Sequence, residues 1–142
     1  MTRVDFYVLS GQDPQQRLLF ACRLAAKALA QRHEIYLHMS DERSAHAVDE
    51  LLWSFDPASF VPHCLAANHS NEPVTIGWGN DPGPHHDVLI NLDLSVPGFI
   101  GRFNRVGEIV VQHPGYRDAL RENYRYYRER GYPLTKHDIA IQ

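Results

Sequence analysis

Apolar and polar residues follow one another in the first half of the chain in the order expected of an α/β protein. Residues 3–9 form a short run rich in Val, Phe and Tyr, which is typical of a buried strand. Residues 14–32 carry apolar side chains at helical spacing. Residues 34–39 predict a second strand and residues 41–53 a second helix. This alternation of strand and helix predicts a parallel sheet with right-handed crossovers.

Polar residues mark the expected starts of these two helices. Asp13 is suited to the N-cap of the first helix, and Pro14 to its first helical position. Ser40 is expected to cap the second helix. The first turn of that helix carries Asp41 and Glu42, whose negative charge is favourable next to the positive end of the helix dipole.

The second half of the chain is less regular, yet three of its segments have the composition of strands. These are residues 74–78, 87–92 and 105–111, the last of which is the final strand that the pattern predicts. Residues 60–65 predict either a short strand or an extended segment interrupted by Pro62, and a short helix is expected near Pro97. Residues 114–130 predict a long final helix, with Gly131 in the position of a C′ glycine.

Length and charge narrow this picture to one domain that is weakly acidic. The chain has 142 residues and no repeat, low-complexity tract or linker, so residues 1–142 are expected to form a single α/β domain. With 14 Lys and Arg against 17 Asp and Glu, the formal net charge is −3. The molecule as a whole should therefore not be drawn to a polyanion.

The cysteine spacing and the N-terminal sequence indicate the expected cellular location. Cys22 and Cys64 belong to no CxxC motif, and both are expected to be buried, reduced thiols. The N-terminus resembles no signal peptide, and no apolar run approaches the roughly 20 residues of a membrane span. A cytoplasmic location without membrane contact is expected.

Candidate catalytic and ligand-binding motifs are sparse. The turn after the first strand, where many α/β sheets bind a nucleotide, offers only Gly11, and Pro14 removes one of the N–H groups there. The adjacent His85 and His86 lack the spacing of a metal site, so surface loop histidines are expected. His63 is expected to be a hydrogen-bonded structural residue. No nucleophile or carboxylate-pair motif is visible, so neither metal, cofactor nor catalysis is predicted.

The final helix separates its cations from its acids. At about 100° per residue, a stripe roughly 60° wide holds four residues: Arg117, Arg121, Tyr124 and Arg128. A neighbouring stripe that includes Leu120 and Tyr127 is apolar and suited to packing on the sheet. The arginines are either ordinary surface residues whose stems cover the edge of the core, or an anion-recognition strip walled by an aromatic ring.

A cluster of large apolar residues lies around the turn after the second helix. It includes Trp53, Phe55 and Phe60, followed by Val61 and Pro62. The cluster either belongs wholly to the core or leaves one edge exposed as a protein-binding patch.

Four segments in order resemble a known family. They are VDELLW at 48–53, SFVPH at 59–63, DVLINL at 87–92 and RENYRYYRERGY at 121–132. They are similar to the LDExLW, SFxPH, D(V/I)LINL and RERYKxYRxxGY-type segments of the chi subunit of bacterial DNA polymerase III. VDFY at 4–7 agrees as well, so the resemblance covers nearly the whole chain.

The resemblance implies a fold and a function. The fold is a Rossmann-like, mostly parallel sheet flanked by helices and without a phosphate-binding loop. The function is that of a non-catalytic clamp-loader accessory protein that binds the acidic C-terminal tail of single-stranded-DNA-binding protein, a tail that ends in Pro-Phe. Matching positions, together with the rest of the stripe, assign tail binding to Arg117, Arg121, Tyr124, Val110, Arg128 and Gly131.

The resemblance also implies a second partner, the psi subunit of the clamp loader. The matching residues are Trp53, Phe60, Val61 and Pro62. A repair helicase, which shares the Phe60 surface in relatives of this family, is a further candidate.

Two other functions stay open on the residues alone. The Arg/Tyr stripe could bind single-stranded nucleic acid directly, because guanidinium and aromatic groups also suit bases, although the acidic net charge counts against it. A nucleotide-dependent enzyme is the other, against which the missing phosphate loop counts. In the adaptor hypothesis the chain contacts DNA only indirectly.

Overall fold

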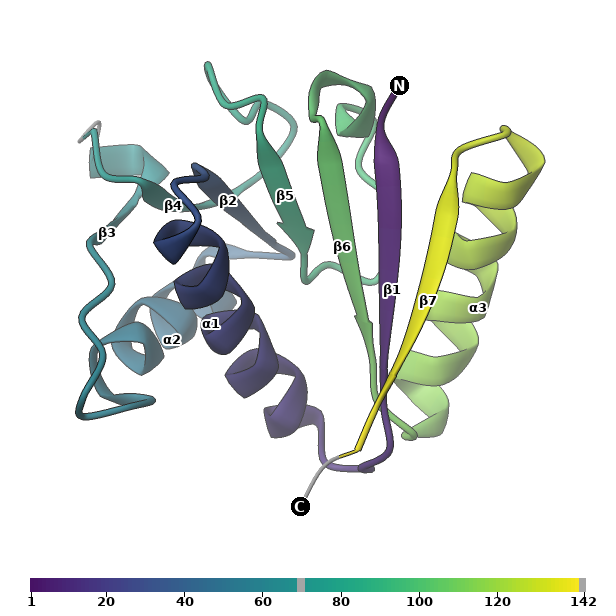
Figure 1. The fold of residues 1–142 in the computed structure, drawn as a ribbon, viewed down its shortest axis with the longest axis horizontal. Helices are drawn as coiled ribbons and strands as arrows, with labels where there is room; N and C mark the ends of the chain where they lie inside the picture. The colour runs from purple at the N-terminus through teal and green to yellow at the C-terminus, as the bar shows by residue number, and fades with distance from the viewer. Residues whose placement is uncertain (69–70, 141–142) are drawn as a thin grey trace.

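Seven strands lie side by side in one sheet, and all of them are parallel (Figure 1). The computed structural model describes residues 1–68 and 71–140. The strands are β1 (Arg3–Leu9), β2 (Ile35–Met39), β3 (His63–Leu65), β4 (Val74–Trp78), β5 (Val88–Asn91), β6 (Arg105–Val110) and β7 (Leu134–Ile139). Their order across the sheet is β3-β4-β2-β5-β6-β1-β7. The expected Rossmann-like α/β fold is confirmed.

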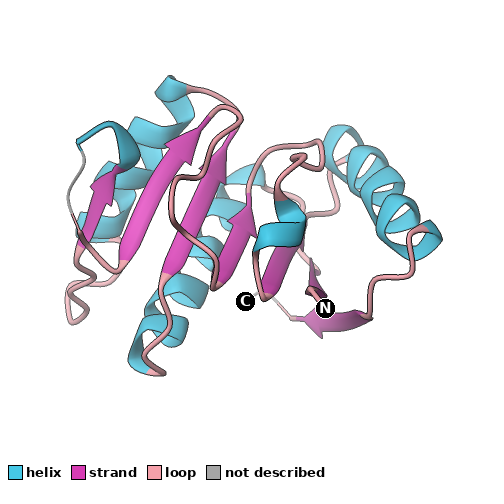
Figure 2. Cartoon of the chain, turned by 90° about the horizontal axis from the view of Figure 1, so that it is seen from above, coloured by secondary structure: helices cyan, strands magenta, loops and turns pink. Residues whose placement is uncertain are grey.

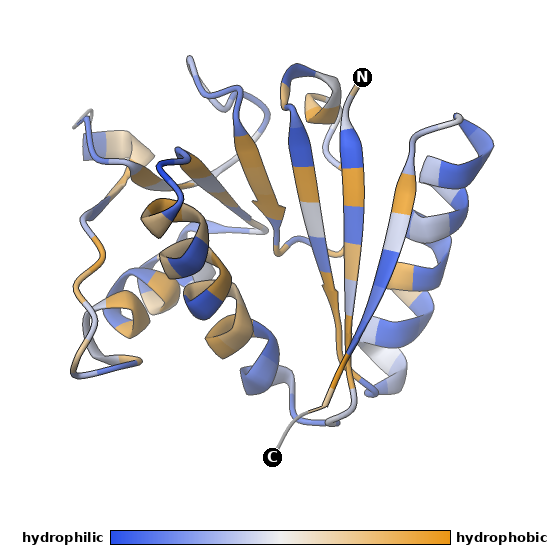
Figure 3. Cartoon of the chain, in the orientation of Figure 1, coloured by the Kyte–Doolittle hydropathy of each residue, from blue (hydrophilic) through white to orange (hydrophobic). Residues whose placement is uncertain are grey.

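Helices cover both faces of the sheet (Figures 1 and 2). In the described part of the chain they are α1 (Pro14–Ala30), α2 (Glu42–Ser54) and α3 (Pro114–Glu129), with two 3₁₀ turns, η1 (Ala66–Asn68) and η2 (Ile100–Arg102). Successive side chains of a strand point to opposite faces. Leu9 of β1 accordingly joins the core under α1 and α2, whereas Phe6 joins the core under α3. Strand β5 is apolar along most of its length, as burial on both faces requires (Figure 3).

The two expected helix starts were predicted with different success. Asp13 caps α1 and Pro14 opens it, as expected. The expectation that Ser40 caps α2 is wrong, because Asp41 does so. The Asp41 carboxylate accepts from the Ser44 N–H at 2.8 Å, and the Ser44 hydroxyl accepts from the Asp41 N–H at 3.3 Å. Ser40 has no such reciprocal partner three residues later, and this capping box fixes the helix start one residue further on.

Helix α3 ends in a Schellman motif built around Gly131. The Gly131 N–H donates to the carbonyl of Arg128, and the Tyr132 N–H donates to the carbonyl of Tyr127, both at 3.1 Å. Gly131 has a φ of 79°, which favours glycine, so its expected role as the C′ residue is confirmed. The motif reverses the chain so that it returns along the sheet.

The returning chain forms β7, which the sequence pattern did not predict. β7 pairs in parallel with β1 at one edge of the sheet. The expectation that residues 105–111 are the last strand is therefore wrong. Between Leu134 and Ile139 the strand carries only polar side chains and most of it is exposed, so no apolar alternation announced it.

Two open expectations are resolved by the structure. Of residues 60–65, only His63–Leu65 form a strand, paired with β4. The short helix expected near Pro97 is the 3₁₀ turn Ile100–Arg102.

Candidate functional site

A pocket of about 310 Å³ lies between α3 and the β6-β1-β7 edge of the sheet. Its lining consists of Phe6, Val8, Val110, Gln112, Arg117, Leu120, Arg121, Tyr124 and Lys136. Strands β1, β6 and β7 and helix α3 thus contribute to these nine residues, which we call the tail pocket after the ligand that the sequence resemblance implies. Segments from both ends of the chain meet here, because β1 lies between β6 and β7.

The packing of α3 decides which side chains face the pocket. Leu120, Asn123 and Tyr127 are the buried residues of the helix and hold it against the sheet. Tyr124 is half-buried, and its ring meets the ring of Phe6 edge-on at 5.1 Å between centroids. This packing leaves the side chains of Arg117 and Arg121 lining the pocket, next to the aromatic wall that Phe6 and Tyr124 form.

The charged groups of the tail pocket are all cations: Arg117, Arg121 and Lys136. The Nε of Arg117 is buried and has no hydrogen-bond partner among the described residues, and its ion pair with Asp118 is long, at 4.0 Å. Arg121 is exposed and has no ion pair in the part of the chain that the structure describes. A buried donor without a partner is costly, so a ligand oxygen at this position would be favourable.

The structure brings together four of the six residues expected to bind the tail. Val110, Arg117, Arg121 and Tyr124 line the pocket, whereas Arg128 is exposed further along α3 and Gly131 lies at its end. Sequence reasoning missed the remaining residues of the lining, Lys136 among them. Leu120 of α3 was expected only to pack on the sheet, and no local signal marks Phe6, Val8 or Lys136, because they come from strands that only the fold places beside α3.

A second surface stands out at the opposite end of the sheet, where α2 leads towards β3. Trp53 and Phe60 are each 64% exposed, and their ring centroids lie 6.0 Å apart. Pro62 is half-buried nearby in the sequence. We refer to Trp53, Phe60 and Pro62 as the aromatic patch. Large exposed rings of this kind are typical of protein-binding surfaces.

The residues next to the patch hold it in place and belong to the interior. Val61 is 3% exposed and packs in the core, so its side chain is not available to a partner in this conformation. His63 is buried, and its Nδ1 lies 2.6 Å from the carbonyl of Val61. Its Nε2 lies 3.1 Å from the carbonyl of Asp49 on α2. The expectation that His63 is a hydrogen-bonded structural residue is confirmed.

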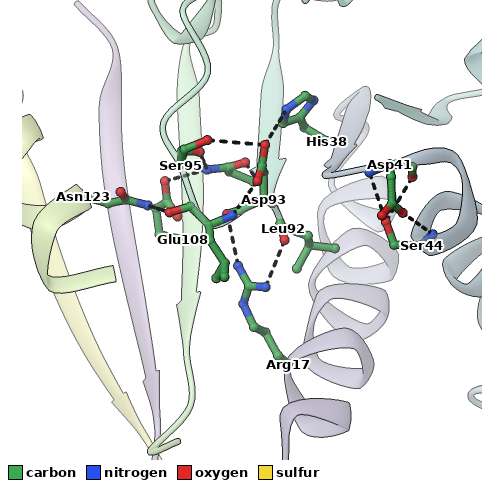
Figure 4. A network of polar contacts seen from close by, with 11 residues as sticks. Arg17, His38, Asp41, Ser44, Leu92, Asp93, Ser95, Glu108 and Asn123 are labelled. Carbon is green, nitrogen blue, oxygen red and sulfur yellow. Dashed lines mark hydrogen bonds and ion pairs between the residues drawn. The ribbon is translucent and has the colours of Figure 1, made fainter. Parts of the chain in front are cut away.

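The carboxyl edge of the sheet, where open α/β sheets commonly bind ligands, is filled by Arg17 of α1 (Figure 4). Arg17 is only 3% exposed. Its guanidinium donates to the carbonyls of Ile109 at 2.8 Å, Leu92 at 2.9 Å and Asp93 at 3.4 Å. Burial lowers the pKa of this guanidinium. A side chain of the protein itself thus uses the carbonyl groups at the ends of β5 and β6.

A buried carboxyl group lies between this edge and α3. Glu108 of β6 is fully buried, and its Oε2 accepts from the Tyr127 hydroxyl at 2.7 Å and from the Asn91 amide at 3.0 Å. Its Oε1 has no hydrogen-bond partner among the described residues. Burial raises the pKa of Glu108 to about 7 although these hydrogen bonds and the charge of Arg17 oppose the rise. The network ties β5 and β6 to the helix that lines the tail pocket.

The remaining candidate groups line neither the tail pocket nor the exposed face of the aromatic patch. Cys22 and Cys64 are buried free thiols, as expected, and burial raises the pKa of Cys22 to about 12. Within residues 1–68 and 71–140, no three His, Cys, Asp or Glu side chains are grouped as metal ligands. No helix in this same part of the chain is both long and apolar enough to cross a bilayer.

Comparison with known proteins finds relatives of one kind along the whole chain. A model of the family described as "DNA polymerase III chi subunit, HolC" matches residues 1–135. A relative from Pseudomonas aeruginosa, named DNA polymerase III subunit chi, is 51% identical over 139 residues, which are 98% of each chain. Relatives of the same name from Haemophilus influenzae and Escherichia coli are each 30% identical. The alignments cover 96% of both chains for the former, and 95% of this chain and 97% of the relative for the latter.

One solved structure is similar in fold. A chain of "The crystal structure of T4 UvsW" superposes with a TM-score of 0.66 at 5% sequence identity. The superposition covers 99% of this chain but 42% of that one. At this identity the likeness shows a common α/β fold alone.

Proposed function

The chain belongs to the family of DNA polymerase III chi subunits, and we propose that it is the adaptor that joins this replicase to single-stranded-DNA-binding protein in the cytoplasm. The family consists of accessory subunits of the polymerase and is not known to be catalytic. A replication accessory role follows from membership. The proposal adds two binding events: the acidic, Pro-Phe-ending tail in the tail pocket, and the psi subunit of the clamp loader on the aromatic patch.

One observation carries the first binding event: the tail pocket combines three cationic side chains with an apolar hollow, and Arg121 among them has no ion pair in the described part of the chain. A peptide that ends in a free carboxylate after Phe offers a negative group and a ring next to each other. Arg117 and Arg121 can donate hydrogen bonds to the carboxylates, and Phe6, Val110 and Tyr124 offer apolar walls for the ring. Recognition of this kind joins charge-assisted hydrogen bonds to burial of an aromatic side chain. Lys136 adds a third cation from the other wall.

The test is calorimetric titration of a short acidic peptide that ends in Pro-Phe. We expect Arg121→Ala to weaken binding by about 1.5–3 kcal/mol, the usual contribution of a hydrogen bond to a charged group. Amidation of the peptide's C-terminus should cost a similar amount, and the two losses should not add if they remove the same contact. Binding should also weaken as salt is added, because the pocket is near the surface.

The matched control is Arg125→Ala, on the same helix. Arg125 is exposed and lies 3.4 Å from Glu122, outside the tail pocket, so this substitution should leave the affinity unchanged. Equal affinities for wild type and Arg121→Ala would place the peptide elsewhere and leave the stripe as a solvated face.

The competing function, direct binding of single-stranded DNA by α3, gives a different result. Naked single strands at physiological salt should leave the protein's electrophoretic mobility unchanged, and a shift should require the single-stranded-DNA-binding protein. A shift caused by DNA alone, lost in Arg117→Ala and Arg121→Ala, would favour direct binding.

The second binding event rests on the exposure of the aromatic patch. Trp53 and Phe60, each 64% exposed, leave much apolar surface in contact with water. A partner that covers these rings removes that surface from water, which favours binding. The same surface would serve a repair helicase, in which case the two partners should compete. Competition between a psi subunit and a helicase for the chain is measurable by displacement from an immobilised complex.

A further inference from the structure

A second groove lies on the face of the sheet opposite α3. Its volume is about 500 Å³, larger than that of the tail pocket. Strands β5, β6, β1 and β7 form its floor, where Ile90, Gly107, Tyr7 and Ile139 lie, and α1 forms its wall. Alternation along the strands separates the two sites, because Tyr7 and His137 face this groove while Phe6, Val8 and Lys136 face the tail pocket.

The floor of this α1 groove is low because β6 contributes a residue without a side chain. A Cβ built on Gly107 would lie 3.5 Å from the ring of Tyr7 and 3.6 Å from Leu24 of α1. Any side chain at this position would therefore enter the space between the helix and the sheet. Tyr7 and Leu24 lie at ordinary contact distance from this position, and the apolar lining of the groove continues through Val88 and Ile90 of β5 to Ile139 of β7.

The rim of the groove is cationic. Arg23 and Lys27 lie one turn apart on α1, both are exposed, and neither has an ion pair in the described ranges. Residues 14–33 contain four basic residues and no Asp or Glu, so no acid of α1 offsets them. Arg105 of β6 lies on the other side of the groove.

The acid that lines the groove is already neutralised. Asp5 is buried, and its two carboxylate oxygens lie 2.9 Å from the Nε of Arg105 and 3.0 Å from the Nε2 of His137. The remaining guanidinium nitrogens of Arg105 are left for a ligand, since the side chain is 41% exposed. The uncompensated positive charge of the groove therefore lies on α1, at Arg23 and Lys27, while Arg105 offers further N–H donors from the other side.

We propose that the α1 groove binds an acidic segment of a partner protein, with its carboxylates between Arg23, Lys27 and Arg105 and an apolar side chain on the floor. Charge complementarity selects an acidic ligand. The floor selects a peptide over a nucleotide base, because the Tyr7 ring already contacts Phe20 at 5.3 Å and stacks on His137 at 4.9 Å between centroids. A long polyanion would also extend beyond the groove onto a protein of net charge −3.

The test is titration of the ¹⁵N-labelled full chain with a short peptide of Asp and Glu residues around one Leu, acetylated and amidated at its ends. Amidation removes the terminal carboxylate that the tail pocket is proposed to recognise, so the two sites are examined separately. We expect the amide signals of Tyr7, Gly107 and His137 to shift. Binding should be about tenfold weaker in Arg23→Glu/Lys27→Glu, because each exposed charge pair contributes a few-fold and the reversal adds repulsion.

Two controls decide the outcome. Arg43→Glu/Arg125→Glu changes the net charge equally at exposed positions outside the groove and should bind the peptide with nearly unchanged affinity. A peptide with Asn and Gln in place of the acids should not shift these signals. Equal weakening in both double variants, absence of shifts, or shifts confined to the tail pocket would overturn the proposal. If oligo(dT) bound more tightly than the acidic peptide and shifted the signals of Tyr7, Gly107 and His137, the groove would be a nucleic-acid site and the proposal would be overturned as well.

Discussion

At the scale of single residues, a substitution of Phe60 can test partner binding without unfolding the protein, because the ring is exposed. Because this ring is largely solvated, Phe60→Ala should change the free energy of unfolding by less than about 0.5 kcal/mol. If the ring anchors a psi subunit, the same substitution should cost at least about 2 kcal/mol of binding. Thermal melting and a binding titration with that subunit measure the two quantities.

The adjacent residue provides the matched control. Val61 is buried in the core, so Val61→Ala should lower the free energy of unfolding by about 2 kcal/mol. A large loss of stability in Phe60→Ala, with binding unchanged, would contradict the assignment of the aromatic patch as a docking surface.

Helical periodicity predicted the arginines and the tyrosine of the tail pocket, which share one helix, but not the residues that the strands contribute. Arg117, Arg121 and Tyr124 recur along one stripe, and this regularity is local to the sequence. Phe6 and Lys136 reach the same pocket from strands that are paired only in the folded sheet, through registers that no local pattern encodes.

The buried charges were invisible to the sequence for a related reason. A periodic pattern assigns charged residues to the surface, yet Arg17 and Glu108 are both buried. The carbonyl of Leu92, which accepts from Arg17, is 75 residues from it along the sequence. Asn91, which donates to Glu108, is 17 residues from it. Only the assembled sheet reveals which groups these buried side chains contact.

At the scale of elements, the end of α3 determines how the chain returns to form β7. We expect Gly131→Ala to lower the free energy of unfolding by about 1 kcal/mol, because an L side chain is strained at a φ of 79°. Nothing lies within 4 Å of a Cβ built there, so the cost would come from the backbone alone. Chemical denaturation of the variant measures it.

Gly98→Ala is the matched substitution. A Cβ on Gly98 also has open space, and its φ is not in the positive range, so the variant should be as stable as wild type or slightly more stable. Equal effects of the two substitutions would show that the conformation of Gly131 does not limit stability.

Elements with apolar repeats were predictable, and the edge strand was not. β1 and β4 were expected at the bounds that the structure has, because burial selects the composition of a strand. β7 is mostly exposed at the rim of the sheet, where its charged residues fit the need of edge strands to avoid pairing with other chains. Its place follows from the turn at Gly131 and from register with β1, neither of which has a hydrophobic signature.

At the scale of the whole molecule, the tail pocket and the aromatic patch lie at opposite edges of the sheet. The tail pocket is next to β7, and the aromatic patch is next to β3, the first and last strands in the spatial order. Six strand spacings separate them, which is about 28 Å. Two partners can therefore be held at once without meeting, which is the geometry that an adaptor needs.

The stability of this framework depends on pH through Glu108, which is buried beneath α3. Its pKa is raised from 4.5 to about 7 in the folded chain, chiefly by burial. The groups that face it are Tyr127 and Asn123 of α3, Asn91 of β5 and, by its charge, Arg17 of α1. Between these pKa values the unfolded chain has released the proton while the native protein still holds it. Rising pH therefore favours unfolding over this range, and the contribution present below pH 4.5 is lost as pH rises through about 7.

Glu108→Gln should remove this dependence. The Gln carbonyl can accept the hydrogen bonds from Tyr127 and Asn91, and its amide takes the place of the unpartnered Oε1 without any charge to desolvate. The variant should match wild type near pH 4.5 and exceed it at pH 8 by on the order of 3 kcal/mol in free energy of unfolding, since one pKa unit corresponds to about 1.4 kcal/mol. Urea titrations across this pH range measure the difference, and Glu122→Gln on the exposed face of α3 is the control that should keep the wild-type slope. If Glu108→Gln and wild type lose stability in parallel as pH rises, the pH dependence arises from other groups and the raised pKa of Glu108 is contradicted.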